Sequence, residues 1–150
     1  MEKKRIVARK ARICDLVNGV FFHGSKLDMK PSYVVVWFGE KISRVNLIGT
    51  AIDSFVSEDE SYGSITIDDG TASIRVKVFG NNVKMVKDIS NGEMLIVIGK
   101  LKEYNGEIYV AAEVVRKVKD LNHESLRKLE ILKDLKEKKR MVEEIRNLVE

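Results

Sequence analysis

Apolar and polar positions alternate most regularly in residues 62–80, YGSITIDDGTASIRVKVFG. Asp69-Gly70 separates two such runs, and this dipeptide between alternating segments is a strong signal for a β-hairpin. In the second run Ile74, Val76 and Val78 share one face of the strand, while Ser73, Arg75, Lys77 and Phe79 share the other. Side chains alternate across a strand, so we predict a buried aliphatic face and an exposed face that is basic and aromatic.

The segments around this hairpin predict further strands and one short helix. Residues 33–38 form a short apolar run, and residues 42–57 form a long β run with Gly49 in its middle, where we expect a bend. Residues 81–89 have apolar positions at helical spacing and an Asn cap, and residues 94–101 and 108–118 predict two more strands joined by a turn at residues 104–107. Trp37 is expected to pack rather than to stack on a base.

This order of elements is typical of one fold class. Five strands with a helix between the third and the fourth are the plan of the OB-fold, a small Greek-key barrel. We therefore predict a mainly β protein with an OB-fold barrel and a C-terminal α-helix. The expected core consists of Val45, Leu47, Ile65, Ile67, Ile74, Val76, Val78, Leu95, Val97, Ile108 and Val110.

The C-terminal segment, residues 120–150, predicts a helix that Asn122 caps, with Leu121 and Leu126 as a hydrophobic staple. Its apolar stripe is interrupted by Lys138. A barrel that is already closed leaves this stripe without a partner, so we predict an oligomerisation helix; packing back onto its own barrel is the alternative. The lysine favours a bundle of three or four helices over a two-stranded zipper. The predicted oligomerisation residues are Leu129, Ile131, Leu132, Leu135, Val142, Ile145 and Val149.

Composition changes this picture in one respect, the placement of charge. The net charge of the 150 residues is +4, but residues 1–30 carry eight Lys and Arg against three Asp and Glu, a net charge of +5. Residues 31–119 have a net charge of −1, and residues 120–150 are neutral. We thus expect a basic N-terminal arm (1–32), a barrel (33–119) and the helix (120–150). The arm, with Lys3, Lys4 and Arg5 at its start, is either a phosphate-binding segment or a solvated tail.

Several classes of protein are not expected. One cysteine allows no internal disulfide, and with two histidines it does not supply a zinc finger. The sequence shows neither a membrane span nor a secretory signal, so we expect a cytoplasmic protein. No catalytic triad, phosphate loop or metal constellation is visible, and Asp68 and Asp69 serve the turn. We therefore predict neither an enzyme nor a metal or cofactor site.

The exposed cations and rings instead indicate a surface for nucleic acid, in which cations contact phosphates and rings stack on bases. A solvated sheet face is the alternative. The predicted binding residues are Arg75, Lys77, Phe79, Lys100, Lys102 and Tyr104.

Five segments carry a resemblance to a known family: residues 42–50, 67–72, 75–80, 99–101 and 104–106. In this order they resemble the small and middle OB-fold subunits of replication protein A, the archaeal ones in particular; related patterns occur in telomeric Stn1-type subunits and in tRNA-anticodon-binding OB domains. Phe79 stands where such sequences often have Trp, so weaker stacking is expected. The resemblance implies a protein that binds single-stranded DNA in replication, repair and recombination and is therefore associated with the nucleoid. It also implies other subunits joined through C-terminal helices, as in a hetero-trimer. An RNA-binding module and an assembly subunit with weak DNA contact are the alternatives.

Overall fold

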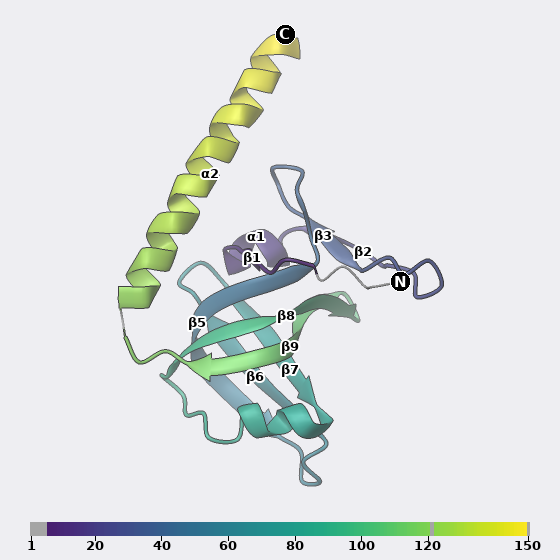
Figure 1. Cartoon of the computed structure of the whole chain (residues 1–150), viewed down its shortest axis with the longest axis vertical. Coiled ribbons are helices and arrows are strands. Elements are labelled where there is room, and N and C mark those ends of the chain that lie inside the picture. The colour runs from purple at the N-terminus through teal and green to yellow at the C-terminus, as the bar shows by residue number, and fades with distance from the viewer. Residues whose placement is uncertain (1–5, 121, 150) are drawn as a thin grey trace.

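A closed barrel forms the centre of the computed structural model, which describes residues 6–120 and 122–149 (Figure 1). The sheet order is β1-β5-β6-β7-β9-β8, and β5 also pairs with β8, which closes the five-stranded barrel. The barrel strands are β5 (Arg44–Val56), β6 (Tyr62–Asp68), β7 (Ser73–Phe79), β8 (Met94–Tyr104) and β9 (Glu107–Lys117). The predicted fold class, an OB-fold barrel with a C-terminal helix, is confirmed.

The length of β5 allows it to pair on both sides. Residues 44–50 pair with β8, and residues 50–56 pair with β6. The register of β5 against β6 shifts between Ala51 and Asp53. The bend was expected at Gly49, so the irregularity lies after the predicted position. Gly49 has a different role, because a Cβ atom there would lie 3.2 Å from the carbonyl oxygen of Asp68 on β6. The glycine permits this close approach of the two strands.

The register of the central hairpin is as predicted. Ile74, Val76 and Val78 are at most 3% exposed, while Phe79 on the opposite face is 52% exposed. All eleven residues of the predicted core are buried. Binary patterning thus correctly indicated which face of each strand packs inside the barrel.

The predicted helix at residues 81–89 is instead a 3₁₀ helix, η1 (Gly80–Met85), followed by turns. The predicted Asn cap is also wrong, because the N-cap residue is Phe79 and no side chain caps it. The apolar positions 83, 86 and 89 are spaced by three residues, and a 3₁₀ helix has three residues per turn. The backbone follows this spacing: the N–H of Val86 donates to the carbonyl of Val83 and that of Ile89 to the carbonyl of Val86. Val83, Val86 and Ile89 are all buried.

Much of the segment predicted as a basic arm is part of the fold. It contains β1 (Arg9–Lys10), which pairs in parallel with β5, α1 (Ile13–Val17) and β2 (Val20–Phe22). Ile13 and Leu16 are fully buried, so α1 covers part of the core and this stretch is not a solvated tail. Lys3, Lys4 and Arg5 lie outside the described residues.

The turn of the central hairpin fixes the start of α1. The backbone N–H of Ile13 donates to a carboxylate oxygen of Asp69 at 2.9 Å, and that of Cys14 donates to the Thr71 hydroxyl at 3.2 Å. These acceptors satisfy N–H groups at the helix start that have no partner within the helix.

A second, three-stranded sheet lies beside the barrel, in the order β2-β3-β4. β3 (Tyr33–Val35) is shorter than the predicted strand 33–38, and β4 is Lys41–Ile42. Trp37 follows β3 in a turn and is 51% exposed, so the prediction that it packs inside is wrong. Its indole N–H donates to the carboxylate of Asp15 at 3.1 Å, which holds the ring at the surface.

The C-terminal helix α2 (Asn122–Val149) begins beside the barrel and projects away from it (Figure 1). Asn122 is the first residue of the helix rather than the residue that caps it, and its backbone N–H donates to a carboxylate oxygen of Asp120 at 3.0 Å. The predicted staple residue Leu121 lies outside the described residues. Among the described residues, polar contacts hold α2 to the rest of the chain: Arg127 donates to Asn46, and Lys10 pairs with Glu130 at 2.6 Å. Lys138 pairs with Glu40 at 3.6 Å, and its ammonium lies 5.9 Å from the ring centroid of Phe38. None of the residues described in α2 is buried.

Candidate nucleic-acid interface

Three aromatic rings lie together on the outer face of the barrel. Tyr62 on β6 is the register partner of Phe79 on β7, and their ring centroids are 5.4 Å apart. Phe55 on β5 extends the group, 6.1 Å from Tyr62. Phe55 and Phe79 are each more than half exposed, so this cluster presents ring surface to solvent.

A lysine with two tyrosines continues this surface toward the β8–β9 turn. The Lys77 ammonium lies 4.1 Å from the ring centroid of Tyr109 and 5.3 Å from that of Tyr104. β9 runs parallel to β7 and pairs Arg75 with Tyr109, which brings this ring to the neighbouring cation. The pKa of Tyr109 is raised by burial and, secondarily, by the nearby Tyr62, so its phenol stays neutral near pH 7.

A hollow of about 460 Å³ adjoins these residues, between β6–β7 and the tip of the β8–β9 hairpin. Arg75 and Glu107 both line it, and they form an ion pair at 3.7 Å. Each side chain is about half exposed, so the pair is solvated and an anion can compete for the guanidinium. The surface as a whole offers rings for bases and a few cations for phosphates.

The structure divides the predicted binding residues into two groups. Arg75, Lys77, Phe79 and Tyr104 lie around the same face. Lys100 and Lys102 on β8 lie beyond β9, which separates β8 from β7, and they line a different hollow.

Sequence reasoning missed Phe55, Tyr62 and Tyr109. Tyr62 has the same parity as Ser64, Thr66 and Asp68, which were assigned to the outer face, so the alternation could have identified it. Tyr109 could not be found in this way, because its position next to Lys77 depends on the parallel pairing of β7 with β9.

The acidic pair in the central turn acts structurally. Asp68 accepts the N–H of Gly70, and Asp69 accepts the N–H and the hydroxyl of Thr71 as well as the N–H of Ile13. Within residues 6–120 and 122–149, no cluster of His, Cys, Asp and Glu has the arrangement of a metal site. Among the same residues, no helix is long and apolar enough to cross a membrane.

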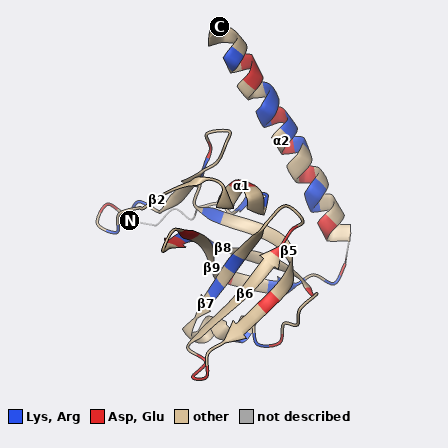
Figure 2. Ribbon diagram, turned by 180° about the vertical axis from the view of Figure 1, so that it is seen from behind, with Lys and Arg blue, Asp and Glu red and all other residues tan. Residues whose placement is uncertain are grey.

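Charge is distributed differently over the barrel and the C-terminal helix. In Figure 2 the basic segments of β7 lie midway along the strand, whereas α2 alternates between basic and acidic segments along its length. The pKa of Glu130 on α2 is lowered by its hydrogen bond from Lys10, and burial lowers the pKa of Arg127. Glu130 and Arg127 thus contact other parts of the same chain. The better candidate for an external anion is the outer surface with Phe55, Tyr62, Lys77, Phe79 and Tyr109, which we call the barrel face.

Comparisons with known proteins agree with this fold. One of the 32 kDa subunits of replication protein A from rice (Oryza sativa subsp. japonica) is 33% identical over 87 residues, which are 56% of this chain and 28% of the rice protein. The chain thus spans less than a third of that relative's length. Because the relative is a plant protein, the archaeal assignment stays a prediction.

Solved structures share the same architecture. The S. pombe Stn1–Ten1 complex contains a chain with a TM-score of 0.73 and 17% identity, matched over 93% of this chain and 98% of the other. A replication protein A heterotrimer bound to single-stranded DNA contains one with a TM-score of 0.70 and 16% identity, matched over 89% and 98%. At these identities the similarity shows the fold.

The family model of the OB-fold nucleic acid binding domain matches residues 44–118. This match begins at the first residue of β5 and ends one residue after β9, so it includes all five strands of the barrel. The protein therefore belongs to the family of OB-fold nucleic acid binding domains.

Proposed function

We propose that this protein is a single-stranded DNA-binding component of a replication protein A-like complex, acting in DNA replication, repair and recombination without catalytic activity. The observation that carries the proposal is the exposed aromatic surface of β5, β6 and β7, next to a lysine flanked by two tyrosines. Proteins that bind single strands without sequence preference combine such rings, on which bases stack, with cations that follow the backbone. The similarity to a replication protein A chain from a complex with single-stranded DNA supports the choice of ligand.

Stacking, rather than charge, is expected to supply most of the affinity of the barrel. Residues 31–119 have a net charge of −1, and Glu107 already pairs with Arg75. The predicted binding residues include four cations, Arg75 and Lys77 on β7 and Lys100 and Lys102 on β8. If a strand contacts all four, their share of the slope of log K against log salt is no steeper than about −3, at about −0.7 per phosphate contact. Through these cations alone, the barrel strands are therefore expected to bind single strands with weak salt dependence.

The C-terminal helix is proposed to join other subunits of the complex, as in a hetero-trimer. Ile131, Leu135 and Val142 are half-buried and share a stripe of the helix with Lys138, which pairs with Glu40. In contrast, Leu129, Leu132, Ile145 and Val149 are each more than half exposed. An apolar surface of this kind on a projecting helix is stabilised when further helices cover it. As part of a complex that binds DNA, the protein is proposed to lie with the DNA in the cytoplasm.

A second candidate function is that of an assembly subunit with weak DNA contact. The ion pair between Arg75 and Glu107 favours it, because this pair leaves few free cations on the barrel face. The two roles are compatible, and measurement decides how much of the DNA binding this protein contributes.

The test is a fluorescence anisotropy titration of the full chain with a labelled oligothymidylate. Unlabelled single-stranded RNA and duplex DNA of the same length serve as competitors. We expect the single-stranded DNA to compete best. Preferential competition by RNA would support an RNA-binding module, and absence of binding would support the assembly role.

A further inference from the structure

A second cationic hollow lies on the other side of the β8–β9 hairpin from the aromatic surface. It has a volume of about 200 Å³, and four lysines line it: Lys26, Lys30, Lys100 and Lys102. No acidic side chain is among its lining residues, and none of the four lysines forms an ion pair with a residue in the described part of the chain. All four are exposed.

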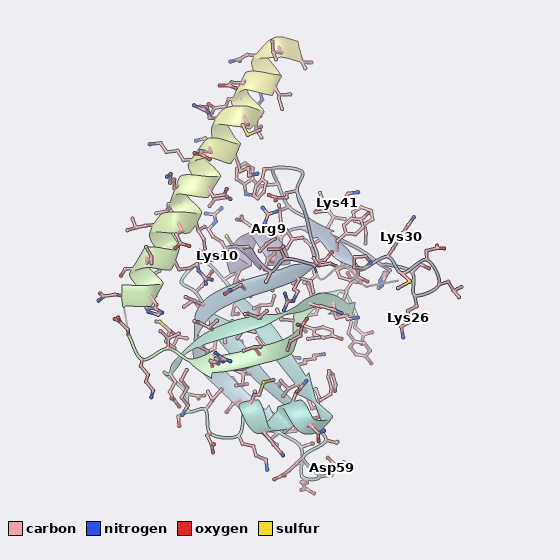
Figure 3. All side chains as sticks on the ribbon, viewed as in Figure 1. Arg9, Lys10, Lys26, Lys30, Lys41 and Asp59 are labelled. Carbon is pink, nitrogen blue, oxygen red and sulfur yellow. The ribbon has the colours of Figure 1, made fainter. Side chains whose placement is uncertain are left out.

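Backbone contacts hold these lysines in place. Lys26 and Lys30 belong to a short loop that Ser25 and Lys30 close with two backbone hydrogen bonds, of 3.0 and 2.9 Å. A Cβ atom at Gly24 would lie 2.2 Å from the carbonyl oxygen of Lys30, so the close approach of this loop requires the glycine. On the opposite wall, Lys100 and Lys102 lie two residues apart on the outer side of β8, about 7 Å from each other at the rise of a strand. Figure 3 shows Lys26 and Lys30 on the side of the molecule away from α2.

Two aromatic residues lie close in sequence to residues that line this hollow. Gly24 and Ser32, which line it, are close in sequence to Phe22 and Tyr33, whose rings stack at 5.3 Å. The ammonium of Lys41 lies 5.0 Å from the ring centroid of Tyr33. Phe22 is 44% exposed, so its ring is accessible to a base.

The hairpin tip connects the two surfaces. Tyr104 at the tip lies next to Lys77 on the barrel face, while the preceding residue, Glu103, lies 3.7 Å from His23. His23 directly follows β2 and directly precedes Gly24 of the hollow. A single strand that leaves the barrel face at Tyr104 therefore reaches the four lysines by passing around one hairpin tip.

We infer that the hollow lined by Lys26, Lys30, Lys100 and Lys102 is a second contact site for the backbone of the same single strand, which extends the binding path beyond the barrel. Four like charges close together repel one another, and phosphates relieve this repulsion. This inference rests on the proposed function. It assigns most of the phosphate contacts to the hollow and most of the base stacking to the barrel face.

The test compares two strand lengths within the range known for one OB fold, oligothymidylates of about 6 and about 16 nucleotides. The variants of the full chain are K26Q/K30Q in the loop and K100Q/K102Q on β8. The control, K84Q/K133Q, removes the same charge from exposed positions on η1 and α2. Affinities are measured by anisotropy over a range of salt concentrations.

For the longer strand, we expect each hollow variant to reduce the magnitude of the salt slope by about 1.4, which corresponds to two phosphate contacts. Between 50 and 200 mM salt the wild type then loses about sevenfold more affinity than the variant. The shorter strand, which occupies the barrel face, is bound by all variants with the wild-type slope, and the control binds both strands as the wild type does.

Three results would overturn the inference. Equal weakening of both strands would mean that the lysines act only as diffuse charge. An unchanged affinity and salt slope with both strands would mean that these lysines do not contact the strand and that the hollow binds another anion, such as an acidic peptide. If the wild-type chain binds neither strand, the proposed function itself is refuted, and the extended path with it.

Discussion

Replacement of Phe79 with alanine isolates the stacking contribution that the proposed function requires. The ring is 52% exposed and its centroid lies 5.4 Å from that of Tyr62. If a base stacks on Phe79, its removal costs about 1–3 kcal/mol of binding free energy. This corresponds to an increase in Kd of about 5- to 140-fold.

The effect of the same substitution on folding is smaller. Phe79 lies outside the barrel core, so the main loss is its interaction with Tyr62, and aromatic pairs contribute about 0.5–1.5 kcal/mol. A domain stabilised by about 5–15 kcal/mol remains folded after such a loss. A thermal melt followed by circular dichroism checks this for the variant before binding is measured.

The assay is a titration of labelled oligothymidylate at several salt concentrations. Phe79→Ala raises Kd but leaves the salt slope unchanged, because the ring carries no charge. The matched control is Phe79→Tyr, which keeps the ring and is expected to bind within about twofold of the wild type. An alanine variant that is folded and binds as tightly as the wild type would refute the idea that a base stacks at this position.

Three further predictions address charge, folding and assembly. Arg75→Ala is expected to make the salt slope shallower by up to about 0.7. Glu107→Gln frees the Arg75 guanidinium and is expected to tighten binding at low salt. Equal salt slopes for Arg75→Ala and the wild type would exclude a phosphate contact at Arg75. Asp69→Ala removes the acceptor of the Ile13 N–H and is expected to lower the free energy of unfolding by about 1–2 kcal/mol in urea; an unchanged midpoint would show that this cap is dispensable. Truncation after Asp120 removes only exposed or half-buried contacts, so a folded monomeric barrel should remain and assembly with partner subunits should be lost; light scattering that detects the same assembly, or loss of the folded barrel, would contradict the role of α2.

The sequence determines which side chains of each strand face the core. In β7, strict alternation places Arg75 and Phe79 outside and Val76 inside, and the structure has this arrangement. Alternation has a period of two residues, so a strand with one buried face has one register, set by local pattern and by the Asp69-Gly70 turn. Because each strand could be recognised from its own alternation, the order of five strands and one short helix could be read from the sequence. This order was sufficient to predict the barrel.

Tertiary structure decides which outward side chains become neighbours. Lys77 and Tyr109 are far apart in the chain, and only the parallel pairing of β7 with β9 brings the ring to the ammonium. The same pairing separates Lys100 from the barrel face, because β9 lies between β7 and β8. Similarly, α1 is capped by Asp69, which is 56 residues distant from Ile13. Contacts between distant segments depend on the closure of the whole barrel, and the pattern within any single segment carries no information about them.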